Sequence, residues 1–170
     1  MGFSYGAKRL MLLAIVLAFG SLSIAEVNIV GAFYVFTKDD PITGAKGVYI
    51  YTNAVEYPRY YDNAALWLRC RGAEFDIFVD ADTYLDNDPL KVMYRIGGGK
   101  PEGPYTWDPS TDGTAAFVRY PLALLRKLLK GDGGKFAFRV WDYQGNELTY
   151  VFSLRGIQKA AKALFCIKRP

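Results

Sequence analysis

The sequence predicts a mainly β fold, an antiparallel β-sandwich with two short helices and one disulfide bond. Three observations favour this fold class. Short segments in which apolar and polar residues alternate recur along the chain, and this period of two is typical of half-buried antiparallel strands. Only two segments have helical spacing, and they do not alternate with the strands as helices do in parallel α/β proteins. The third observation is the pair of cysteines, Cys70 and Cys166, which allow one pairing only.

The clearest strand pair is a hairpin with arms at residues 65–71 and 74–80. In its second arm Phe75, Ile77 and Val79 share one face, so we expect this face to be buried. The opposite face carries Glu74, Asp76, Phe78 and Asp80. A second hairpin is predicted from residues 135–142 and 147–154, and the remaining strands from residues 29–36, 47–52, 92–96, 105–108 and 114–118.

The first helix is expected to begin at Pro121, a residue tolerated in a first turn, and to end before Gly131. Its predicted inward stripe consists of Leu122, Leu125 and Leu129, widened by Leu124 and Leu128. A second amphipathic helix is expected at residues 156–165. Residues 26–170 therefore read as a single β-sandwich-like domain.

The first 25 residues are typical of a signal peptide. Lys8 and Arg9 precede an apolar run at residues 10–19, which is too short to cross a hydrocarbon core of ~30 Å as a helix. Small residues at 23 and 25 then offer a cleavage site. We expect cleavage before Glu26, with an uncleaved anchor as the alternative. The mature protein would be exported, and would meet the membrane only through this segment before cleavage.

An exported chain meets an oxidising environment, so we expect a Cys70–Cys166 disulfide, with two buried free thiols as the alternative. Loss of Lys8 and Arg9 on cleavage lowers the formal net charge from +4 to +2. This charge is too small to predict a nucleic-acid partner.

The sequence contains no histidine, which removes the commonest general base and metal ligand. Two cysteines alone cannot complete a structural zinc site. We therefore expect no enzymatic activity and no cofactor. The acidic residues 80–88 invite a calcium site, but Tyr84 and Leu85 break the EF-hand pattern. A solvated loop is expected there, and cation binding stays an open alternative.

Four residues are candidates for contact with a partner: Tyr105, Trp107, Thr111 and Asp112. Residues 109–113 have turn chemistry, so one interpretation is a hairpin turn above a buried Trp107. The other is a recognition edge formed by this turn and the loop at residues 97–104, since Trp and Tyr are frequent hot-spot residues. The tyrosines at positions 57, 60 and 61 could instead form a sugar- or peptide-binding platform.

A set of ordered elements resembles the VasI-like proteins associated with bacterial type VI secretion gene clusters. The elements lie at residues 66–70, 84–85, 92–96, 107–117, 136–140 and 152–160, followed by Cys166. The insertion at residues 100–104 departs from this pattern. The resemblance implies an exported bacterial accessory protein, periplasmic or secreted, without an established enzymatic activity. It brings no catalytic residues.

The sequence thus favours a non-enzymatic, exported binding or accessory protein with a protein partner in the cell envelope. One alternative is an inhibitor of an envelope hydrolase of the lysozyme type. Another is a carbohydrate-binding or carbohydrate-active protein.

Overall fold

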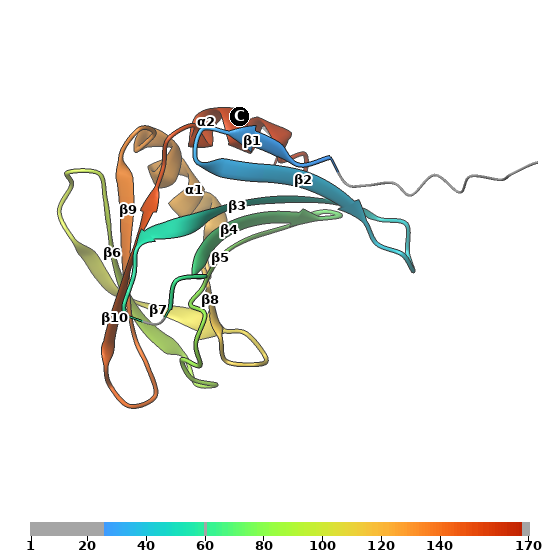
Figure 1. Cartoon of the computed structure of the whole chain (residues 1–170). Helices are drawn as coiled ribbons and strands as arrows, with labels where there is room; N and C mark the ends of the chain where they lie inside the picture. Colours follow the sequence, from blue (N-terminus) through green and yellow to red (C-terminus); the bar gives the residue numbers. More distant parts are fainter. Residues whose placement is uncertain (1–25, 60, 168–170) are drawn as a thin grey trace, which may run out of the picture.

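The computed structural model describes residues 26–59 and 61–167 (Figure 1). The expected signal peptide lies outside these residues. The elements in chain order are β1 (Asn28–Val30), β2 (Phe33–Asp39), β3 (Lys46–Glu56), β4 (Ala65–Arg71), β5 (Glu74–Asp80), β6 (Leu90–Ile96), β7 (Glu102–Pro109), β8 (Ala115–Phe117), α1 (Pro121–Lys130), β9 (Lys135–Trp141), β10 (Glu147–Ser153), α2 (Ile157–Ala160) and the 3-10 helix η1 (Ala161–Ala163).

The strands form an antiparallel sheet that closes into a barrel (Figure 1). Its order is β1-β2-β3-β10-β9-β6-β7-β8-β5-β4, and the pairing of β4 with β3 closes eight of the strands on themselves. Strands β1 and β2 extend the sheet beyond the barrel from one edge of β3. The mainly β class, the two short helices and the disulfide are confirmed. The expected sandwich is corrected to a closed barrel.

Two strands that pair with members of both layers explain this closure. One edge of β3 pairs with β4 through residues 47–53, whereas the other pairs with β2 through residues 46–51 and then with β10 at Ala54 and Glu56. In β7, residues 102–107 pair with β6, and Asp108 and Pro109 pair with β8. A strand that passes from one sheet to another makes a corner. Two such corners join what would otherwise be the two layers of a sandwich.

The expected strand at residues 29–36 is instead a tight hairpin of β1 and β2. Gly31 has a φ of +66° at the turn, a conformation that glycine adopts readily. The next amide, Ala32 N–H, donates to the Arg155 carbonyl at 2.8 Å. The turn is therefore held against the segment that enters α2.

Other boundaries also shift. Strand β7 begins at Glu102, inside the expected loop at residues 97–104, and β3 runs from Lys46 to Glu56. The C-terminal helix is only α2 followed by η1. The two predicted hairpins, β4–β5 and β9–β10, are confirmed.

The core fills the barrel with large side chains from both halves of the chain. Its largest fully buried members include Phe33, Phe136, Phe138, Tyr150 and Phe152. The Tyr150 hydroxyl donates to the Ala81 carbonyl at 2.8 Å, which satisfies the buried polar group. Burial raises the pKa of Tyr150, so this hydroxyl stays protonated and can donate.

Helix α1 packs against β5 and α2. Its bounds match the prediction, and its inward face departs from it only at Leu122, since Leu129 packs against the core. The buried side chains are Leu124, Leu125 and Leu128, whereas Leu122 is 46% exposed. Within the described residues, no helix is both long and apolar enough to cross a membrane.

Candidate functional site

A row of aromatic side chains crosses the outer face of the sheet. Because successive residues of a strand point to opposite faces, core residues such as Ile50, Leu66 and Ile77 alternate with a second, outward set. Five outward residues lie directly opposite one another in register across β2, β3, β4, β5 and β8: Tyr34, Tyr51, Trp67, Phe78 and Phe117. Each of the five is partly exposed.

These five rings stack on one another. The ring centroids are 4.9 Å apart for Tyr34–Tyr51, 4.5 Å for Tyr51–Trp67, 5.9 Å for Trp67–Phe78 and 4.6 Å for Phe78–Phe117. The interplanar angles lie between 7° and 25°. Ring faces in the middle of the row are therefore covered by neighbouring rings, and ring edges point outward. Such cross-strand pairs also stabilise the sheet.

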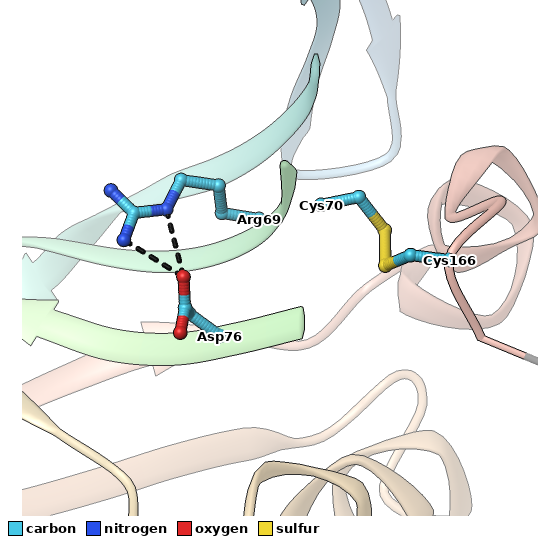
Figure 2. The surroundings of a disulfide bond; sticks show 4 residues. All are labelled: Arg69, Cys70, Asp76 and Cys166. Atoms are coloured by element: carbon cyan, nitrogen blue, oxygen red, sulfur yellow. Dashed lines mark hydrogen bonds and ion pairs between the residues drawn. A yellow bond between two sulfur atoms is a disulfide. The ribbon is translucent and has the colours of Figure 1, made fainter. Parts of the chain in front are cut away.

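A second row lies beside the first. Phe36 stacks on Tyr49 at 5.2 Å, and the next strands contribute Arg69 and Asp76 at paired positions. The Arg69 Nε and Nη2 donate to Asp76 Oδ2 at 3.1 and 2.8 Å (Figure 2). The guanidinium also lies 5.0 Å from the Phe78 ring centroid.

We call the two rows together the aromatic face: Tyr34, Phe36, Tyr49, Tyr51, Trp67, Arg69, Asp76, Phe78 and Phe117. It combines apolar ring edges, tyrosine hydroxyl groups and one fixed ion pair. Sugar-binding platforms present a ring face to the ligand, and the inner faces here are already occupied. The chemistry therefore suits a protein surface better than a sugar ring.

The disulfide lies on the opposite side of β4. Figure 2 shows Cys70 directed to Cys166 while its chain neighbour Arg69 extends to Asp76. The two cysteine Cα atoms are 5.8 Å apart, and the bond joins β4 to the segment after η1. The predicted pairing of Cys70 with Cys166 is thus present, and it anchors the C-terminal segment to the strand that carries the middle of the aromatic face.

Two of the predicted partner-binding residues lie in β7 with different exposures. Tyr105 is 41% exposed and stacks on Tyr94 at 5.3 Å. Trp107 is only 3% exposed and packs against Phe138 at 5.2 Å. The structure therefore places Trp107 in the core, as the hairpin-turn interpretation expects, and leaves Tyr105 accessible.

The other two, Thr111 and Asp112, lie in the exposed β7–β8 turn. Asp112 Oδ1 accepts hydrogen bonds from the Ser110 hydroxyl and the Thr114 amide, and these lower the pKa of its carboxyl group. The 97–101 loop lies at the other end of β7, about 25 Å away for a strand of this length. The structure thus does not bring the two loops together into the expected recognition edge.

A crevice of about 350 Å³ lies between β7 and α1. Beside it, the Lys127 ammonium group bonds the Glu102 carboxylate and lies 3.3 Å from the Tyr94 hydroxyl. The Tyr105 hydroxyl donates to Glu102 at 3.1 Å. The hydrogen bond from Lys127 is the main cause that lowers the pKa of Glu102. The cluster is an ion pair that holds α1 to β7.

We expect Glu102→Gln to reduce the free energy of unfolding at pH 7 by at most about 1 kcal/mol, since both partners are more than a third exposed. The folded-state pKa of Glu102 is lowered, so its contribution is present above the unfolded-state value near 4.5 and is lost as the pH falls through the folded value. Urea unfolding of both proteins between neutral and acid pH measures this. A difference in unfolding free energy between wild type and Glu102→Gln that stays constant through the acid range would contradict this expectation. The control is Glu74→Gln, because the Glu74–Arg71 pair is longer, at 3.6 Å.

The remaining candidate features have structural explanations. In the acidic segment, Asp82 Oδ2 accepts from the Asn63 amide groups and Asp86 Oδ1 accepts from the Asn87 N–H. Among the described residues, no group of three or more metal-binding side chains lies close enough to hold an ion. Tyr61 packs against the core, Tyr57 is exposed, and Tyr60 lies outside the described residues.

The aromatic face was missed by the sequence interpretation. Its signal was present, because Phe78 falls among the polar residues of its strand and Trp67 alternates with Leu66 and Leu68. The pairs Tyr34–Phe36 and Tyr49–Tyr51 show the same two-residue spacing. An aromatic residue on the non-core face of several strands is the pattern that could have revealed it.

The fold and face define a closed, disulfide-bonded β-barrel with an aromatic outer surface. No protein-family model matches the chain, and no curated protein matches it. Among solved structures, it is similar to invasion associated protein B from Bartonella henselae, with 13% identity and a TM-score of 0.56. The match covers 82% of this chain and 95% of that chain. At this identity the similarity shows the fold alone.

Proposed function

We propose that this protein is an exported, non-enzymatic binding module that docks a protein partner of the cell envelope on its aromatic face. The observation that carries the proposal is the stack of five rings held at the outer surface of the barrel. Large aromatic groups outside a core often mark an interaction surface, and Trp and Tyr dominate interface energetics. Arg69 and Asp76 add a fixed ion pair that can select among partners.

Export is the second part of the proposal. Residues 1–25 have the pattern of a signal peptide, and a disulfide persists in oxidising compartments such as the periplasm. If the segment is cleaved, the intact mass of protein isolated from the envelope fraction should equal that of a chain that begins at Glu26. A mass that retains residues 1–25 would contradict cleavage.

An accessory role beside a secretion apparatus is the narrower form of the proposal. It is supported by the resemblance of about residues 46–166 to VasI-like proteins. The fold is also shared with a protein whose structure is described as invasion associated. Of the two, only the resemblance to VasI-like proteins implies an accessory role without an established enzymatic activity.

The test is site-specific photocrosslinking in living cells. A photoreactive residue at Tyr49, on the aromatic face, is compared with one at Thr149, which is similarly exposed but lies on β10. We expect one predominant envelope protein to crosslink from position 49 and not from 149. Equal adducts at both positions, or none at 49, would overturn the proposal.

Identification of the crosslinked protein separates the narrower alternatives. A secretion-apparatus component supports the accessory role, and a cell-wall hydrolase supports the inhibitor. Tyr34→Ala removes the ring at the end of the row and should weaken binding about tenfold, a loss of about 1.4 kcal/mol in binding free energy. The control is Tyr143→Ala, an exposed tyrosine in the β9–β10 turn.

A further inference from the structure

A second surface lies at the helical end of the barrel, on elements other than those of the aromatic face. Helix α1, the segment from α2 to Ile167 and the β4–β5 turn enclose an open groove of about 1200 Å³, which we call the helical groove. Its apolar lining includes Phe75, Leu125, Leu129, Leu164 and Ile167.

Large apolar side chains project beside this groove. Tyr120, which precedes α1, is 78% exposed, and Leu122 in its first turn is 46% exposed. Both line the groove. Phe165, between the lining residues Leu164 and Cys166, is 53% exposed. All three side chains are therefore large, apolar and accessible at the groove.

The charge around the helical groove is mainly positive; Glu74, between the lining residues Ala73 and Phe75, pairs with Arg71 at 3.6 Å. Residues 119–131 and 155–167 contain seven Lys or Arg residues and no Asp or Glu: Arg119, Arg126, Lys127, Lys130, Arg155, Lys159 and Lys162. Arg119 and Lys127 pair with carboxylates of β7, whereas Arg126, Lys130 and Lys159 are exposed. The neighbouring Asp132 accepts hydrogen bonds from the Gly156 and Gln158 amides.

We propose that the helical groove docks this protein on the surface of a lipid bilayer that contains anionic lipid. Tyr120, Leu122 and Phe165 enter the interfacial region, and Arg126, Lys130 and Lys159 face the lipid phosphates. Projecting aromatic and aliphatic groups flanked by cations are the features of peripheral membrane contacts. A peptide groove buries its apolar lining and receives the partner's anchors, whereas here Tyr120, Leu122 and Phe165 are themselves exposed and can act as anchors. The docking does not depend on the function proposed for the aromatic face.

The test is co-flotation of the protein with vesicles of phosphatidylcholine, with or without phosphatidylglycerol. All variants carry the same N-terminus, so any contribution from residues 1–25 is shared. We expect the protein to float with the anionic vesicles and to remain at the bottom of the gradient when the vesicles are neutral. We also expect it to dissociate from the anionic vesicles as the salt concentration rises. Equal binding to both vesicle types, or none to either, would overturn the proposal.

Matched variants locate the contact. Leu122→Glu and Lys159→Glu should each weaken binding to anionic vesicles at least tenfold. Their controls place the same change elsewhere, Ile42→Glu in the β2–β3 turn, where Ile42 is 93% exposed, and Lys100→Glu in the 97–101 loop. Thermal melting checks that every variant is folded. Equal losses of vesicle binding in the two control variants would overturn the proposal. It would also be overturned if soluble polyglutamate bound the protein and prevented flotation while Leu122→Glu left vesicle binding unchanged.

Discussion

The Cys166→Ala protein is expected to lose about 4–5 kcal/mol of unfolding free energy, because the disulfide closes a long loop in the unfolded chain. The two cysteines are 96 residues apart in sequence. On the chain-entropy account, a loop of this length gives close to the largest stabilisation that one crosslink supplies. Since small domains have total stabilities of about 5–15 kcal/mol, this loss would remove a large share of the margin. Denaturant unfolding under non-reducing conditions measures it.

The choice of Cys166 separates the crosslink from packing. Cys70 is fully buried, and its removal would add a cavity, whereas Cys166 is only partly buried. Wild-type protein treated with reductant should unfold near the midpoint of Cys166→Ala, and reductant should not change the variant further. An equal midpoint for oxidised wild type and Cys166→Ala would show that the crosslink does not contribute to stability.

The disulfide also bears on the organisation of the two proposed surfaces. Cys166 lines the helical groove, and its partner Cys70 lies next to Arg69 of the aromatic face. One covalent bond therefore fixes the C-terminal segment to the strand at the centre of the other surface. The two surfaces lie on different elements, so one molecule could contact a bilayer and a protein partner together.

Local sequence patterns predicted the local structure well. The β4–β5 and β9–β10 hairpins and the bounds of α1 follow from alternation, turn residues and a terminal glycine, all of which are encoded within a few residues. The closure of the barrel is different. It depends on β3 and β7 each pairing with strands of both layers. Alternation shows which face of a strand is buried, but not which strand lies beside it.

The same reason explains why the aromatic face was not predicted. Alternation places Phe78 away from the core, but its neighbours Trp67 and Phe117 come from β4 and β8. Residue 117 is distant in sequence, and only the pairing of β5 with β8 puts it in the row. Conversely, Tyr105 and Trp107 share the spacing of one strand face yet differ in exposure, because Trp107 lies next to the corner where β7 reaches β8.

Gly31→Ala is the second change for which we expect a large effect, a loss of about 3–5 kcal/mol of unfolding free energy from backbone strain and overpacking together. The φ of +66° at Gly31 is unfavourable for any residue with a Cβ. A Cβ added there would also lie 2.8 Å from the Arg155 carbonyl carbon and 3.0 Å from the Gly156 Cα, both of them backbone atoms. Relief of this overlap requires the β1–β2 turn to move away from the entry to α2, and the hydrogen bond from Ala32 to Arg155 would be lost.

Gly44→Ala is a matched control, since Gly44 has a φ of +67° and no atom within 4 Å of an added Cβ. It carries the conformational cost without the overlap, so we expect it to lose only about 1 kcal/mol. Parallel denaturant unfolding of the two variants isolates the cost of the close approach at Gly31. Strands β1 and β2 lie outside the closed barrel. The loss of unfolding free energy in Gly31→Ala therefore also shows whether this hairpin and α2 unfold together with the barrel. Losses of equal size in the two variants would show that the β1–β2 turn can move away from Arg155 at little cost in free energy. The contact with Arg155 would then add little to the stability of the fold.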